Sequence, residues 1–124
     1  MIRLTIPYPK SKAGRASWSK QFGLNAIYAG KHWSRRKQDS EYWHMIVAGE
    51  LRKQGITKQP ANKPVKICFC WNDRLDLDNH AYMRKMIIDA LKGWVIKDDD
   101  RRYISAITDG WHDDDCIIVE VTEA

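Results

Sequence analysis

The stretch VKICFCWNDRLDLDNHAYMRKMIIDALKG, residues 65–93, decides the fold. Apolar side chains alternate with other side chains over residues 65–71, which predicts a strand with one strongly apolar face. Apolar side chains then recur at helical spacing up to Gly93, and a glycine at this place is typical of a helix end. Asp78 or Asn79 would cap the start of this helix. A strand that leads almost directly into a helix places the polar residues between them at the end of the strand.

The other predicted elements complete a small α+β domain. They are a strand at residues 2–6, a helix at residues 35–54 capped by Ser34, and two strands at residues 103–108 and 116–121. The polar residues 109–115 indicate a hairpin loop between the last two strands. Residues 10–31 show no sustained period, so we expect an irregular loop there. The sequence predicts one domain, residues 1–124, with a small mixed sheet and two main helices.

The bulk composition is that of a globular protein. Hydrophobic residues make up 44% and charged residues 30% of the 124 residues, which argues against disorder. No apolar run approaches the ~20 residues that span a bilayer, and residues 1–6 lack the layout of a secretion signal. The three cysteines form no C-x-x-C pair, so we expect small hydrophobic side chains and not a zinc site. We expect a cytoplasmic protein without membrane contact.

Charge is divided unevenly along the chain. Residues 1–72 contain 14 Lys and Arg against 3 Asp and Glu, a net charge of +11, whereas residues 73–124 contain 7 against 13, a net charge of −6. A basic surface is typical of proteins that bind nucleic-acid phosphates. The acidic half would repel DNA unless cations intervene.

Two basic segments are candidates for contact with nucleic acid. In residues 10–31 lysines are mixed with three aromatic rings, at Trp18, Phe22 and Tyr28, and such rings stack on exposed bases. The alternative is that these rings fill the core. Residues 35–37, Arg-Arg-Lys, would oppose the dipole at the start of their helix, which indicates that their charge serves a partner anion.

Two acidic clusters are candidates for a divalent-metal site. In Asp76-Leu77-Asp78, alternation at the end of a strand would direct both carboxylates to one side. A carboxylate from Asp98, Asp99 or Asp100 would complete the site if Val95-Ile96 folds back beside that strand end. Mg²⁺ prefers such oxygen ligands together with a substrate phosphate. The alternative is that the first aspartates only cap a helix and the later ones are solvated.

A lysine accompanies these carboxylates on the predicted helix. Asp78, Tyr82, Lys85 and Asp89 follow each other at helical spacing. Lys85 would therefore lie on the same side as the first aspartates, where it would offset charge that grows on a phosphate during its reaction.

The motifs together resemble the RusA family of Holliday junction resolvases, which is common in prophages. The resemblance is carried by residues 75–79, Lys85, Asp89-Ala90-Leu91, Gly93 and Asp98-Asp99, and by Ile6-Pro7 with Pro9 and residues 30–33 near the start. It implies a RusA-like fold and a homodimeric, Mg²⁺-dependent endonuclease that resolves four-way DNA junctions by paired nicks, with no small-molecule cofactor.

The resemblance also implies roles for individual residues. Asp76, Asp78 and Asp99 correspond to catalytic metal ligands, with Asp98 and Asp100 as alternatives to Asp99. Lys85 corresponds to the catalytic lysine by its distance from Asp89, although Asn79 and Lys85 are about one helical turn farther apart than in the family pattern. The predicted DNA-binding residues are Lys31, His32, Arg35, Arg36 and Lys37. Two other functions remain open, a non-catalytic module that binds branched DNA and a nuclease that acts on flaps or forks.

Overall fold

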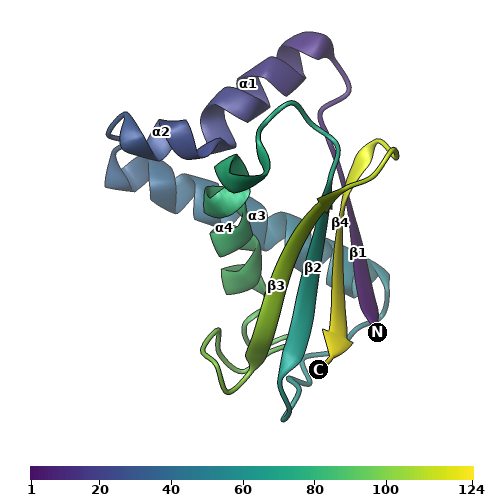
Figure 1. The fold of residues 1–124 in the computed structure, drawn as a ribbon. Helices are drawn as coiled ribbons and strands as arrows, with labels where there is room; N and C mark the ends of the chain where they lie inside the picture. The colour runs from purple at the N-terminus through teal and green to yellow at the C-terminus, as the bar shows by residue number, and fades with distance from the viewer.

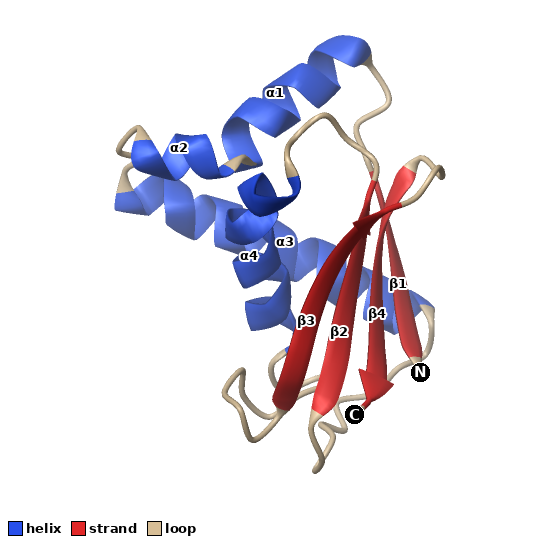
Figure 2. Cartoon of the chain, in the orientation of Figure 1, coloured by secondary structure: helices blue, strands red, loops and turns tan.

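The computed structural model describes all residues from 1 to 124 and has two layers, a four-stranded sheet with helices on one face (Figure 1). The strands are β1 (Ile2–Pro7), β2 (Val65–Trp71), β3 (Ile104–Trp111) and β4 (Cys116–Glu123). The helices are α1 (Lys12–Phe22), α2 (Leu24–Tyr28), α3 (Trp33–Lys53), the short 3-10 helix η1 (Leu77–His80) and α4 (Ala81–Leu91). Figure 2 shows the helices gathered on one side of the sheet and the two termini at the same end. The α+β class is confirmed.

The sheet order β1-β4-β2-β3 differs from the predicted hairpin. β4 is antiparallel to both β1 and β2, whereas β3 pairs only with β2, in parallel. The prediction that residues 109–115 join two paired strands is therefore wrong, since β2 lies between β3 and β4. β4 contains the buried run Ile117-Ile118-Val119, and strands rich in such residues occupy central positions. β3 carries Ser105, Thr108 and Asp109 and lies at the edge.

The core lies between the sheet and the two main helices. Val65, Ile67, Phe69 and Trp71 of β2 are all buried, as their alternation predicts. The apolar residues that recur at helical spacing in α4 are buried as well: Met83, Met86, Ile87, Ala90 and Leu91. They belong to one continuous hydrophobic cluster with residues of α3. A single core confirms that β2 and α4 form the centre of the domain.

The expected irregular loop at residues 10–31 is wrong, because this segment forms α1 and α2. Ser11 caps α1, and its hydroxyl accepts a hydrogen bond from the backbone N–H of Gly14. Trp18 and Phe22, four residues apart, are both buried, and the Phe22 ring lies 5.3 Å from that of Trp43 in α3. These rings therefore fill the core. Their helical spacing was masked by the polar residues between them.

The two main helices begin close to the predicted places. α3 begins at Trp33, and its cap is His32 and not Ser34: the ring Nδ1 of His32 accepts from the backbone N–H of Ser34 at 3.2 Å. Trp43, Val47 and Leu51 of this helix are buried, Ile46 is half-buried, and Tyr42 is 40% exposed. None of the helices is long and apolar enough to cross a membrane.

The start of α4 differs from the prediction in detail. Asp78 and Asn79 lie inside η1 and do not cap α4, which begins after His80. The chain makes this extra turn because His80 is fully buried and must reach into the core before the helix continues. Gly93, at φ +82°, turns the chain after α4 as predicted.

Phe69→Ala is expected to lower the free energy of unfolding by about 3–5 kcal/mol, because Phe69 is fully buried at the centre of the core. Lys66→Ala, on the exposed face of the same strand, is the matched control and should cost less than about 1 kcal/mol. Urea denaturation measures both. Equal losses in the two variants would contradict this placement of β2.

Candidate functional site

A buried polar cluster holds the segment between β2 and α4. Both carboxylate oxygens of Asp73 lie within hydrogen-bond distance of His80 Nε2, at 2.8 and 2.9 Å. The other ring nitrogen, Nδ1, lies 3.1 Å from the carbonyl oxygen of Leu77. The His80 ring stacks on Trp71 with 4.1 Å between ring centroids. The orientation of His80, and with it the path of η1, is therefore held on three sides.

The strand β1 contributes to the same cluster through the residue that follows it. The Tyr8 hydroxyl donates to Asp73 Oδ2 at 2.8 Å and accepts from the backbone N–H of Asn72, also at 2.8 Å. Burial raises the pKa of Tyr8 far above its usual value, so the hydroxyl remains a donor. The backbone N–H of Leu75 donates to Asp73 Oδ1 at 3.0 Å. We call Tyr8, Asp73 and His80 the Asp73 cluster.

The two aspartates of the Asp-x-Asp motif lie on this anchored segment. Asp76 and Asp78 are exposed, while Leu75 and Leu77 between and beside them pack against the core. The prediction that this motif lies at the end of a strand is wrong, because β2 ends at Trp71 and Asp78 lies in η1. Neither carboxylate forms a hydrogen bond or an ion pair with another residue of the chain. Two unpaired carboxylates are therefore presented to solvent from a rigid support.

Asp99 lies in a second, charge-paired cluster beside the C-terminal half of α4. The ammonium of Lys92 is 3.2 Å from Asp99 Oδ2 and 3.1 Å from Asp89 Oδ1. Lys85 Nζ lies 3.4 Å from Asp89 Oδ1 and 3.9 Å from Asp99 Oδ2. The hydrogen bond from Lys92 lowers the pKa of Asp99. The structure thus brings Lys85 and Asp99 together, with Lys92 closer to Asp99 than Lys85 is.

The structure does not group the three predicted metal ligands. The prediction that Val95-Ile96 folds back beside the end of β2 is wrong: the backbone N–H of Ala61 donates to the carbonyl oxygen of Val95 at 2.9 Å, before β2 begins. Val95 and Ile96 turn this way because they are buried in the core. Asp99 is thereby held at the opposite end of α4 from Asp78. No three His, Cys, Asp or Glu side chains form a group that could hold a metal ion.

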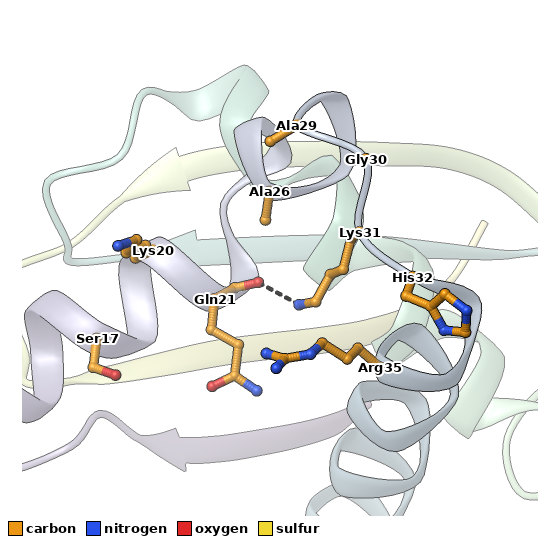
Figure 3. Close-up of a pocket in the computed structure, with 9 residues that line it drawn as sticks. All are labelled: Ser17, Lys20, Gln21, Ala26, Ala29, Gly30, Lys31, His32 and Arg35. Carbon is orange, nitrogen blue, oxygen red and sulfur yellow. Dashed lines mark hydrogen bonds between the residues drawn. The ribbon is translucent and has the colours of Figure 1, made fainter.

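A basic groove of about 600 Å³ lies between α1, α2 and the start of α3 (Figure 3). Its lining residues are Ser17, Lys20, Gln21, Ala26, Ala29, Gly30, Lys31, His32 and Arg35. None of them is acidic. Figure 3 shows Arg35 reaching from α3 toward Gln21 of α1. We refer to this cavity as the basic groove.

A buried ion pair forms the base of the basic groove. The Lys31 side chain is only 9% exposed and is paired with the carboxylate of Asp39 in α3. Lys31 Nζ also donates to the carbonyl oxygen of Gln21 at 2.8 Å, the contact drawn in Figure 3. Gln21 Nε2 and the Tyr82 hydroxyl donate to the two Asp39 oxygens at 2.9 and 2.6 Å. This Asp39 cluster of Gln21, Lys31, Asp39 and Tyr82 joins α1, α3 and α4.

The predicted DNA-binding residues therefore divide into two kinds. Lys31 already has a carboxylate partner inside the protein, Asp39, which neutralises its charge. Its role in DNA binding stays a prediction. Arg35, Arg36 and Lys37 are exposed in the first turn of α3, where no acidic residue accompanies them. His32 is exposed and caps the same helix.

Comparison with known proteins does not identify a family for this chain. No protein-family model matches the chain, and no curated protein matches it either.

Sequence reasoning missed three features of these sites. The Asp73 cluster was not predicted, because Tyr8 and Asp73 are 65 residues apart in the sequence and meet only in the folded chain. Asp39 was not singled out, because its partners Lys31, Gln21 and Tyr82 are near it only in the folded chain. Lys92 was also missed, although it lies three residues after Asp89, a spacing that places two side chains on the same face of a helix. That spacing was the available signal.

Asp39→Ala is expected to lower the free energy of unfolding by about 3–5 kcal/mol, because it leaves the buried ammonium of Lys31 without its partner. Glu41→Ala, an exposed carboxylate on the same helix, should stay within about 0.5 kcal/mol of wild type. Urea denaturation of both variants measures the difference. An Asp39→Ala protein as stable as Glu41→Ala would show that the pair contributes nothing.

Lys92→Ala is expected to return the pKa of Asp99 toward its ordinary value of 3.8. Since the folded chain lowers this pKa, the resulting stabilisation is present above pH 3.8 and is lost as the pH falls through the lowered value. When the pH falls from neutral to below the lowered pKa of Asp99, the free energy of unfolding should therefore decrease less in Lys92→Ala than in wild type. A ¹³C NMR titration of the Asp99 carboxyl group measures the pKa. Lys97→Ala, an exposed lysine in the same segment, should leave it unchanged.

Proposed function

We propose that the protein is a Mg²⁺-dependent endonuclease that nicks four-way DNA junctions. One observation carries the proposal: Asp76 and Asp78 are exposed, unpaired carboxylates on a segment fixed by the Asp73 cluster. Unpaired carboxylates two residues apart repel each other, and a divalent cation relieves that repulsion. The resemblance of the surrounding motif to the RusA family gives the reaction and the substrate.

The donor set on the segment fits Mg²⁺. The ion takes hard oxygen ligands and is commonly held by one or two carboxylates with a substrate phosphate, so Asp76 and Asp78 would hold it together with the DNA. Asp99, for which Asp98 and Asp100 are the alternatives, is not part of this donor set, because the structure holds it beside Lys92 at the opposite end of α4. When bound, the ion would polarise the phosphoryl group and lower the pKa of an attacking water.

Lys85 is proposed to act on the DNA and not on the fold. Its side chain is mostly exposed, and its contacts with Asp89 and Asp99 are at 3.4 Å or more. Exposed pairs of this kind contribute little stability, so the ammonium is free to turn toward a phosphate. There it would offset negative charge that grows during cleavage.

The exposed cations of α3 are proposed to hold the arms of the junction. Arg35, Arg36 and Lys37 have no carboxylate partner in the chain, and each phosphate that they neutralise releases condensed counterions. Their position in the first turn of α3 costs helix stability, which is consistent with a role in binding. His32 beside them is exposed and caps the same helix.

A homodimer is proposed because the reaction needs two nicks in opposed strands. A two-fold axis relates two identical sites, and a four-way junction has matching symmetry. One active site per protomer then accounts for paired cleavage without a second kind of subunit.

The alternative of a non-catalytic module that binds branched DNA is favoured by the pairing of Asp99. This carboxylate is already neutralised by Lys92 and Lys85, as a purely structural residue would be. The module would bind junctions in a salt-sensitive manner but would not cut them when Mg²⁺ is added. Flaps and forks in the same cleavage assay test the other nuclease substrates.

Asp76→Asn is expected to slow Mg²⁺-dependent nicking of a synthetic four-way junction by about 100-fold or more, because it removes a metal ligand. Asp113→Asn, an exposed aspartate in the loop before β4, is the matched control and should cut like wild type. In EDTA the Asp76→Asn protein should bind the junction at least as tightly as wild type, since one repelling charge is gone. Equal nicking by Asp76→Asn and wild type would refute the nuclease.

A further inference from the structure

The basic groove contains cations that the protein itself leaves without partners. Lys20 and Arg35 line it from α1 and α3, and neither is among the ion pairs of the chain, in contrast to Lys31, Lys85 and Lys92. No acidic residue lines the groove, so these two exposed cations are free to pair with an anionic ligand. The volume of about 600 Å³ is in the usual range of ligand pockets.

Two exposed aromatic residues are neighbours, in the sequence, of residues that line the groove. Trp33 is 63% exposed, and its ring lies 5.5 Å from that of His32, which lines the groove. Tyr28 is 79% exposed and directly precedes the lining residue Ala29. By contrast Trp18, in the same helical region, is buried. Exposed rings beside unpaired cations are the combination that binds single-stranded nucleic acid.

We propose that the basic groove binds an unpaired stretch of DNA, with phosphates at Lys20 and Arg35 and a base stacked on Trp33. The proposal rests on the proposed function in taking DNA as the ligand. In a duplex the bases are stacked on each other, so a ring such as Trp33 gains a partner only where bases are unpaired. The groove therefore selects branched DNA with unpaired nucleotides next to the branch point.

The groove is preformed, which favours a binding role. The Asp39 cluster fixes Lys31 and Gln21 at its base, and Figure 3 shows Lys20, Gln21 and Arg35 arranged around the cavity from two helices. A ligand therefore does not have to order these helices on binding, which lowers the entropic cost.

The groove is connected to the Asp-x-Asp segment. α2, which forms one wall, packs against η1. Gly23, between α1 and α2, lies so close to Leu75 that an added Cβ would be 3.3 Å from Leu75 Cδ2. A DNA strand that leaves the groove along α2 thus passes toward Asp76 and Asp78. Binding of the unpaired strand would place the neighbouring phosphates near these carboxylates.

The experiment measures DNA binding in EDTA by fluorescence anisotropy, so that no cleavage takes place. The probes are a labelled oligodeoxythymidine of about twelve nucleotides and a blunt duplex of the same length. Trp33→Ala should weaken binding of the single strand by about 10-fold or more and binding of the duplex by less than about 2-fold, and Trp33→Phe should restore most of the affinity because it keeps a ring. Arg35→Ala should weaken binding and reduce the slope of log K against log salt by about 0.7.

The matched controls lie on the same helix. Met45 is an exposed apolar residue of α3, and Lys53 is an exposed cation at its other end, about 27 Å from Arg35 along the helix axis. Met45→Ala and Lys53→Ala should bind the single strand like wild type. All variants alter exposed side chains, and circular dichroism checks that they fold.

Three outcomes would overturn the proposal: single-strand binding by Trp33→Ala equal to that of wild type, equal losses on single strand and duplex, or tighter binding of an oligouridine of the same length. The result is independent of the nuclease assignment, because Asp76→Asn should bind the single strand in EDTA as wild type does. Failure of Mg²⁺-dependent nicking would refute the nuclease and leave this binding site standing. Absence of specific single-strand binding, with Mg²⁺-dependent nicking intact, would refute this binding site and leave the nuclease standing.

Discussion

The contact between Asp73 and His80 is the interaction on which the arrangement of the molecule depends. It joins the end of β2 to the end of η1 across a fully buried imidazole ring, and Tyr8 adds the end of β1 through the same carboxylate. A buried carboxylate is stable only when its oxygens are hydrogen-bonded, and here three groups bind it: the Tyr8 hydroxyl, the Leu75 backbone N–H and His80 Nε2. The consequence is that the segment between β2 and α4, residues 72–80, takes one path, with the leucines inward and Asp76 and Asp78 outward.

The second polar cluster, around Asp39, performs the same task for the other side of the molecule. It holds the turn before α3 to α1 and α4 through the ion pair with Lys31. Together the two clusters fix both surfaces to which we assign a function, the carboxylate segment and the basic groove, and α2 joins them by packing against η1. Both surfaces are therefore preorganised by polar contacts, and Gln21 and Lys31 of the Asp39 cluster also line the basic groove.

The charged side chains of the protein are of two kinds, those paired with an opposite charge of the chain and those without such a partner. Lys31, Lys85 and Lys92 face carboxylates of the chain, whereas Lys20, Arg35, Arg36 and Lys37 face none. Part of the excess of cations in the first half of the sequence thus lies unpaired on α1 and at the start of α3. The acidic half is divided in a similar way, with Asp89 and Asp99 neutralised by lysines and Asp76 and Asp78 open to solvent.

The sequence by itself determined β1, β2 and the core face of α4, because each follows from local alternation or helical spacing. It also determined the α+β class. Tertiary structure alone decided that β4 enters between β1 and β2, since strand order depends on which strand buries both faces, and that α1 and α2 form, since their few apolar rings gain stability only against α3. It also decided the partner of each charged group. Asp39 is paired with Lys31, and Asp99 is paired with Lys92. Asp99 lies at the opposite end of α4 from Asp78 because the chain after α4 follows the buried residues Val95 and Ile96. No local sequence pattern encodes such long-range packing.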